Sequence, residues 1–299
     1  MTGEAASQSP RRWKPLRVIL WIVFGGVLLV ILVNVLWPDL DLSDEDRIGL
    51  IRVEGIILDS KETVGELKEF GESSTVKAIV LRIDSPGGGV VPSQEIHDAV
   101  KRVRNKNNKT VVASMGTVAA SGGYYIASAT DRILANPGTL TGSIGVIMEL
   151  ANLQGLFKKL GVENVVVKSG RYKDIGSPFR KMTPADRRIL QAVMDDVHGQ
   201  FIEAVAEGRS LDIGEVLPLA DGRIFTGRQA KDMMLVDELG NLGDAIRLAA
   251  DMVGIEGEPK VVEPSKPFSL RRLIEGHLFG SMPRLGFQPS VRLKYLMAF

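Results

Sequence analysis

Residues Val118–Ala129 read VAASGGYYIASA, with one serine directly before two glycines and small side chains on both sides. A glycine inside a helix costs about 1 kcal/mol relative to alanine, so Gly122 and Gly123 need a structural reason. A surface loop needs no such crowd of small residues, whereas a close approach between two backbone segments does. We therefore expect another stretch of backbone to pass directly against Ser121 and its two glycines.

A second glycine-rich stretch, RIDSPGGGV at Arg82–Val90, also follows an apolar run and leads into a helical pattern. Its glycines, Gly87–Gly89, leave backbone N–H groups uncovered, which suits an anion. A plain turn after Pro86 is the alternative interpretation. The spacings G-x-x-x-x-G-K-[ST] and G-x-G-x-x-G of phosphate loops are both absent. Because sites in α/β folds gather where strands end and helices begin, both glycine stretches mark the same kind of position.

The order of the segments predicts an α/β fold with a mostly parallel sheet, since short β-rich runs alternate with helical ones. We expect one catalytic domain over residues 47–263. The expected strands are 47–55, 76–84, 109–115, 131–136 and 163–170. The expected helices are 63–73, 92–105, one from about Ser121, 153–161 and 184–209, and the second of these has apolar residues at Ile96, Val100 and Val103.

The run Leu16–Trp37 is apolar except for Arg17 and Asn34, and its length matches a bilayer core of about 30 Å. Basic residues precede this run and acidic residues follow it, which predicts a single-pass anchor with the N-terminus inside. A buried core helix and a cleaved secretory signal are the alternatives. We expect a cytoplasmic tail over 1–15, a membrane helix over 16–37, an acidic linker over 38–46 and a basic, apolar tail over 264–299. The catalytic domain would then lie on the outer face of the cytoplasmic membrane.

The composition excludes several chemistries. The 299 residues contain no cysteine, which rules out thiol nucleophiles, disulfides and thiolate metal sites. The net charge of +1 gives no reason to expect nucleic acid as a partner. No cofactor or metal is implied.

Ser121 is the candidate nucleophile. If its Oγ attacked a carbonyl, the N–H groups of Gly122 and Gly88 could hold the oxyanion, and such donors are worth about 3–4 kcal/mol each. The alternative is a serine that only caps a helix. The histidines are poor candidates for the base, because His97 and His198 fall on expected solvated helix faces and His277 lies in the tail.

Lys173 is the candidate base. It lies in KSGRYKDIGSPF, residues 168–179, an irregular segment before the long helix. A lysine must be neutral to accept a proton, and burial can lower its pKa by several units from about 10.4. Tyr172, Ile175 and Phe179 are the side chains expected to exclude water from it. A solvated loop lysine is the alternative.

The stretches DSPGGGV, AASGGYYIA, TLTGSIGV, SGRYKDIGSP and GRIFTGRQAKDMMLVDELG occur in an order that resembles signal peptide peptidase A, over roughly Arg47–Gly254. This family of membrane-bound serine proteases shares the Clp protease and crotonase fold. The resemblance implies a Ser/Lys dyad of Ser121 and Lys173, oxyanion amides at Gly88 and Gly122, and Ser143 as a partner of the lysine.

One copy of the motifs, with both dyad residues, resembles the short form of this family. That form implies a homo-oligomer, commonly an octameric ring, in which neighbouring subunits help complete each site. The implied substrates are remnant signal peptides in the lipid bilayer. A membrane protease that cuts stomatin-like partners, an acyl-CoA enzyme of the crotonase type and a non-catalytic membrane scaffold remain alternatives.

The C-terminal tail has three interpretations. It could lie on anionic lipid, because it is cationic and partly amphipathic. It could pack against a neighbour in the ring. Its last residues, YLMAF at 295–299, could instead mimic a product and enter an active site.

Overall fold

The computed structural model describes residues 14–36, 45–264 and 294–297, with the side chains of 18–29, 45–264 and 294–297. The chain divides into two compact units, one ending at Glu45 and the other beginning at Asp46. In the first unit, helix α1 covers Lys14–Leu36, where the apolar run predicts a helix. No helix within the described ranges is long and apolar enough to cross a membrane. Most of the expected N-terminal tail, of the acidic linker and of the C-terminal tail, which holds His277, lies outside the described residues.

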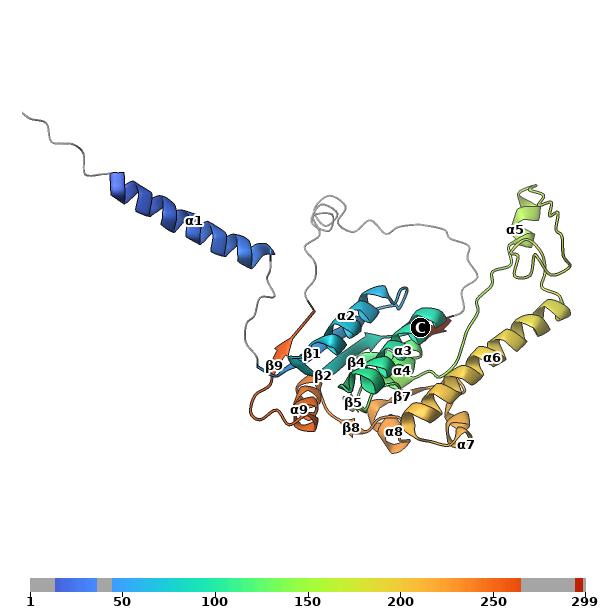
Figure 1. The fold of residues 1–299 in the computed structure, drawn as a ribbon. Helices are drawn as coiled ribbons and strands as arrows, with labels where there is room; N and C mark the ends of the chain where they lie inside the picture. The colour runs from blue at the N-terminus through green and yellow to red at the C-terminus, as the bar shows by residue number, and fades with distance from the viewer. Residues whose placement is uncertain (1–13, 37–44, 265–293, 298–299) are drawn as a thin grey trace, which may run out of the picture. The chain divides into compact units, whose positions relative to one another are not determined.

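The second unit contains an eight-stranded sheet with the order β7-β6-β4-β2-β1-β9, and β5 pairs with both β4 and β8 (Figure 1). Every pair in this sheet is parallel except β6 with β7. The predicted α/β class with mostly parallel pairing is therefore confirmed. The strands are β1 (Arg47–Glu54), β2 (Val76–Ser85), β4 (Thr110–Ala120), β5 (Arg132–Ala135), β6 (Leu140–Gly142), β7 (Ile224–Thr226), β8 (Glu238–Leu239) and β9 (Lys260–Val262).

A second, two-stranded sheet pairs β3 (Gly87–Gly89) with β10 (Lys294–Leu296). The helices of this unit include the five expected ones, which differ from the prediction by only a few residues at their ends, and 184–209 matches in full. They are α2 (Lys61–Glu72), α3 (Val90–Asn107), α4 (Gly122–Ala127), α5 (Gln154–Lys159), α6 (Pro184–Arg209), α7 (Ile213–Val216), α8 (Gly227–Asp232) and α9 (Leu242–Met252), with the 3-10 helix η1 (Leu217–Leu219).

Both faces of the large sheet are buried, as β2 illustrates. Successive side chains of a strand point to opposite faces. Ala78 and Val80 belong to the cluster of buried side chains that includes Ala245 and Ala249 of α9. Ile79 and its neighbours on the other face join the larger cluster, which holds residues of α2, α3, α4 and α6. Helices on both faces explain why β2 is a nearly continuous apolar run.

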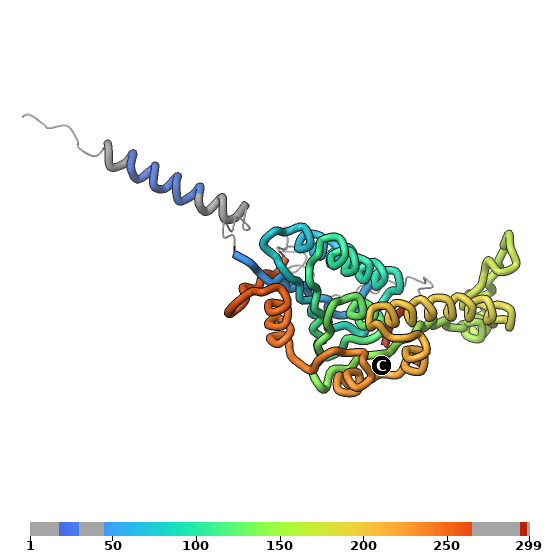
Figure 2. Tube along the Cα trace, turned by 60° about the horizontal axis from the view of Figure 1, so that its bottom comes forward, coloured from blue at the N-terminus to red at the C-terminus, as the bar shows by residue number. Residues whose placement is uncertain are grey.

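The expected strand at 163–170 is wrong. These residues form no strand, and Val165 and Val167 are 79% and 97% exposed. The β-branched run VVV has high strand propensity, but a strand requires a partner for its backbone groups, and this segment pairs with none of the described residues. It lies with α5 at the N-terminal end of α6, and we call residues 148–183 the arm (Figures 1 and 2).

A buried ion pair fastens the C-terminal end of α6 to the segment before β8. Arg209 donates two hydrogen bonds to the Asp237 carboxylate, at 2.8 and 3.0 Å. The two side chains are only 7% and 15% exposed. Asp237 also accepts a hydrogen bond from the backbone N–H of Ile133 in β5 at 2.7 Å. The pair therefore links α6 to the edge of the sheet.

Replacing Arg209 with methionine would remove both guanidinium hydrogen bonds of the buried Asp237 carboxylate and leave it a longer ion pair with Arg132, at 3.5 Å. Breaking such a pair costs about 3–5 kcal/mol. We expect Arg209→Met to lower the free energy of unfolding by about 3 kcal/mol in urea titration. Arg228→Met, at an exposed position of α8, should change it by less than about 0.5 kcal/mol. Equal effects of the two substitutions would contradict the prediction.

Candidate active site

Ser121 stands at the junction of β4 and α4 in a strained conformation. Its φ of 53° and ψ of −117° lie outside the regions that residues other than glycine favour. Its N–H donates to the carbonyl of Gly142 at 2.8 Å, which holds the turn. The side chain makes no capping hydrogen bond, so the interpretation of Ser121 as a helix cap is wrong. Strain of this kind is typical of active-site residues.

The hydroxyl of Ser121 is buried and unused. The residue is 1% exposed, and its Oγ has no hydrogen-bond partner among the described residues. A buried hydroxyl without a partner carries a desolvation cost, so native proteins rarely leave one in place without a role. Ser121 therefore has the burial and the unpaired hydroxyl expected of a candidate nucleophile.

The expected close approach of backbone to the two glycines is confirmed. A Cβ on Gly122 would lie 2.5 Å from Ser93 Oγ and 3.3 Å from the backbone N of Gly88. A Cβ on Gly123 would lie 2.9 Å from the carbonyl oxygen of Ser85. The two glycine-rich stretches therefore pack against each other directly, and the residues proposed for the oxyanion, Gly88 and Gly122, are neighbours.

Gly87–Gly89 forms an extended strand, so the alternative of a plain turn after Pro86 is wrong. A bridge with Ile57 lies along one edge of β3. A Cβ on Gly88 would approach the Ile57 carbonyl oxygen to 2.1 Å. No residue with a side chain fits here without a backbone shift.

The other edge of β3 carries the C-terminal strand β10. The two strands are antiparallel, with Tyr295 opposite Gly88. Ile147 bridges to Lys294 from the far side, so β10 lies between two segments of the body. The backbone N–H of Met297 donates to the Pro86 carbonyl at 2.9 Å. An extended segment of the chain, β10, therefore lies between β3 and Ile147, and we call this position the peptide groove. One edge of the groove is Gly87–Gly89, which packs against Gly122, the residue after Ser121.

Tyr295 fills an aromatic pocket. Its side chain is fully buried and stacks on Tyr125, with 5.2 Å between the ring centroids. Phe201 of α6 lies 4.7 Å away, and the Tyr295 hydroxyl donates to the Val197 carbonyl at 3.1 Å. Burial raises the pKa of Tyr295. The pocket accepts an aromatic ring and offers an acceptor for a hydroxyl at its end.

His97 lies behind this pocket, and its expected solvated position is wrong. It is 5% exposed, its ring lies 4.7 Å from that of Tyr125, and burial lowers its pKa. The signal was present in the sequence. Ser93, Ile96, His97 and Val100 follow the i, i+3, i+4, i+7 spacing of one helix face, and all are buried.

A cavity of about 740 Å³ is lined in part by the end of β10. Ser143, which is 8% exposed, lines it together with His198, Leu296 and Met297. His198 is half-buried rather than on the surface, and its Nε2 has no hydrogen-bond partner among the described residues. Ser143 follows Gly142, whose carbonyl accepts the hydrogen bond from the Ser121 N–H, so one lining residue of the cavity is next in the chain to a hydrogen-bond partner of the candidate nucleophile, which does not itself line the cavity.

Lys173 lies in the arm, and one chain does not bring it to Ser121. The segment between α5 and α6 that carries it stands at the end of α6 remote from α4 in both views (Figures 1 and 2). Tyr172 and Lys173 are exposed, so the chain's own Ile175 and Phe179 do not exclude water from the amine. Of the expected site residues, the structure therefore gathers Ser121, Gly88, Gly122 and Ser143 and leaves Lys173 apart.

Two family models match the chain. The Peptidase family S49 model covers residues 103–256, more than half of the 299 residues, and the Clp protease model covers residues 58–138. Together these matches define a serine peptidase with a Clp protease-like α/β fold. Within that class, the chain belongs to peptidase family S49. This assignment favours peptide hydrolysis over the acyl-CoA chemistry that the sequence left open.

Three relatives illustrate the family. A Synechocystis protein named provisionally as a protease is 45% identical over 245 residues, which are 81% of this chain and 87% of that protein. An Enterococcus faecium protein named provisionally as signal peptide peptidase SppA is 37% identical over 68% of this chain and 63% of its own length. Protease 4 of Haemophilus influenzae is 33% identical over 70% of this chain but only 35% of its own length.

Because β10 lies in the groove, it should compete with added peptides. Tyr295→Ala removes a fully buried aromatic side chain, a change worth about 3–5 kcal/mol, and should release the strand. We expect KM for an extended peptide to fall about tenfold or more, with kcat unchanged. Lys294→Ala keeps the aromatic contacts and should leave both constants near wild type. An unchanged KM in Tyr295→Ala would show that the strand does not compete.

Proposed function

We propose that this chain is a membrane-anchored serine endopeptidase that binds extended peptides along β3 and cleaves them with Ser121 and Lys173. The observation that supports it best is β10, a peptide strand paired with Gly87–Gly89 beside a buried, unpartnered Ser121 hydroxyl. Strand addition gives affinity through backbone hydrogen bonds and leaves selectivity to side-chain pockets. A peptidase with broad sequence tolerance needs this form of recognition.

The proposed reaction has two steps. The neutral amine of Lys173 takes the hydroxyl proton as Ser121 Oγ attacks the scissile carbonyl carbon. The amides of Gly88 and Gly122 stabilise the oxyanion. The protonated lysine then gives its proton to the leaving amine as the C–N bond breaks. Water, deprotonated by the same lysine, hydrolyses the acyl-enzyme, and its proton returns to Ser121.

Lys173 comes from another copy of the chain in this proposal. A single chain holds the amine in an exposed arm, away from its own Ser121 (Figure 1). The cavity beside Ser143 provides room for a side chain that enters from outside. Exposed apolar residues of the arm, including Leu160, Val165 and Val167, suit burial against a second copy. A closed ring, such as an octamer, gives every copy the same environment.

The substrates we propose are apolar peptides held in the membrane, of which remnant signal peptides are one class. A membrane tether formed by the apolar run at 16–37 would keep the peptidase near such peptides at high effective concentration. The catalytic domain would then face away from the cytoplasm, consistent with basic residues before the apolar run and acidic ones after it. The aromatic pocket favours a large ring at one subsite, in contrast to small or aliphatic side chains.

Two inactive variants provide the test. Ser121→Ala and Lys173→Ala should each lower kcat for an apolar peptide by about 10³-fold or more. When the two variants are co-assembled, about a quarter of the sites in a randomly mixed ring pair an intact serine with an intact lysine from a neighbour. We therefore expect activity to return on mixing. Peptide profiling would distinguish signal-peptide remnants from stomatin-like partners.

Retention of wild-type kcat in either single variant would rule out the dyad. If mixed assemblies form, as mass measurement would show, yet stay inactive, the amine does not come from a neighbouring copy.

A further inference from the structure

The turn that carries Lys173 has little backbone structure to hold it. The Lys173 N–H donates to the Gly170 carbonyl at 3.2 Å, and the Ser177 N–H donates to the Asp174 carbonyl at 3.1 Å. These are successive tight turns with no strand or helix around them. A base must be held within a fraction of an ångström of its target to be efficient. Side chains therefore have to supply the rigidity that the backbone of this segment lacks.

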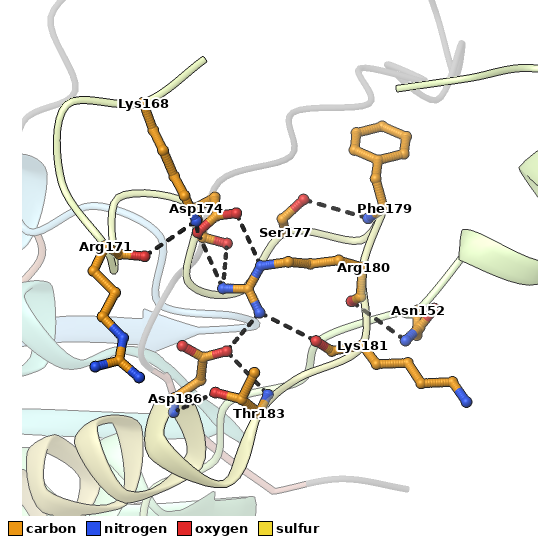
Figure 3. Close-up of polar contacts among 10 residues, drawn as sticks. All are labelled: Asn152, Lys168, Arg171, Asp174, Ser177, Phe179, Arg180, Lys181, Thr183 and Asp186. Carbon is orange, nitrogen blue, oxygen red and sulfur yellow. Dashed lines mark hydrogen bonds and ion pairs between the residues drawn. The ribbon is translucent and has the colours of Figure 1, made fainter. Parts of the chain in front are cut away.

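Arg180 supplies it through every N–H of its guanidinium (Figure 3). Nε donates to Asp174 Oδ2 at 2.9 Å, and Nη2 donates to Asp174 Oδ1 at 3.1 Å and to the Asp174 carbonyl at 3.3 Å. Nη1 donates to Asp186 Oδ2 at 2.5 Å and to the Lys181 carbonyl at 3.1 Å. All five donors are used. Through them Arg180 binds both the side-chain carboxylate and the backbone carbonyl of Asp174, the residue after Lys173.

The other end of this arrangement is the first turn of α6. Asp186 is 2% exposed and forms a capping box with Thr183. Its contact with Arg180 holds the pKa of the Asp186 carboxyl well below its usual range. Helix α6 then runs from this turn into the core, where Phe201 and Val205 are fully buried. One guanidinium thus joins the Lys173 turn to a rigid helix.

Lys168 completes the contacts of Asp174. Its Nζ donates to Asp174 Oδ1 at 2.6 Å and to the Arg171 carbonyl at 3.1 Å. The hydrogen bonds from Arg180 and Lys168 lower the pKa of Asp174 to about 2. The carboxylate next to Lys173 is therefore fully occupied by cations of its own arm.

We propose that Arg180 is the positioning residue for Lys173, fixing the lysine-bearing turn on α6 so that the amine reaches the serine of another copy in one orientation. This inference rests on the proposed function, in which Lys173 is the base. Lysine cannot replace Arg180, because an ammonium has three donors and lacks the planar fork that grips a carboxylate. The peptide groove is formed by β3 and Ile147, outside the arm. Weaker positioning of the Lys173 turn should therefore affect the reaction step and not peptide binding.

The experiment compares Arg180→Lys with Arg188→Lys in the full-length assembled protein, since Arg188 is an exposed arginine near the start of α6, two residues after Asp186. Displacement of a catalytic group by about 1 Å costs on the order of 10²-fold. We expect Arg180→Lys to lower kcat by about 10- to 100-fold, with KM, the midpoint of thermal unfolding and the particle mass unchanged. Arg188→Lys should retain the wild-type kcat.

A double variant separates positioning from general structural support. Because Arg180 acts through Lys173, adding Arg180→Lys to Lys173→Ala should lower the residual rate no further. An activated aryl ester, whose leaving group needs no proton, keeps that residual rate measurable. Wild-type kcat in Arg180→Lys, loss of the assembled particle, or an equal further loss in the double variant would overturn the inference. Wild-type kcat in Lys173→Ala would instead refute the proposed function itself.

Discussion

Three backbone segments meet at Gly87–Gly89 with no side chain between them, and the geometry of the site depends on that contact. Ile57 lies along one edge of the glycine strand, Tyr295 lies along the other, and Gly122 lies against its face. A Cβ at Gly87 or Gly88 would come within 2.1 Å of a carbonyl oxygen. This packing brings the end of β2 against the start of α4. The tight β4–α4 connection holds Ser121 at a φ that L-residues seldom adopt.

The two residues of the candidate dyad lie in surroundings that differ in burial and in rigidity. Ser121 belongs to the densely packed body, where both faces of the sheet are covered and the residue is 1% exposed. Lys173 belongs to a solvent-exposed turn whose order comes from Arg180 and its two carboxylate partners. A buried nucleophile needs a partner that can reach it, and a projecting arm provides reach at the cost of local rigidity. The arginine contacts offset that cost.

Much of the body was predictable from the sequence, because its signals are local. The apolar runs of the buried strands, the helix at 184–209 and the glycines that require close backbone approach all act within a few residues. The sequence missed what depends on packing between distant segments. Helical spacing placed His97 in the apolar stripe of α3, but its polar character favoured solvent. The run at 163–170 has strand propensity but pairs with none of the described residues. The pocket for Tyr295 joins segments that are far apart in the chain, as the hydrogen bond from Tyr295 to Val197 at a separation of 98 illustrates.

The placement of Lys173 on an arm remote from its own Ser121 has a consequence for when the enzyme becomes active. Under the proposed mechanism, a newly synthesised subunit carries a nucleophile with no base beside it and is silent while it remains solitary. Latency then requires no propeptide and no inhibitor, since self-association is the activating event. Turnover would rise more steeply than linearly with the amount of protein, which confines proteolysis to places where the subunits accumulate.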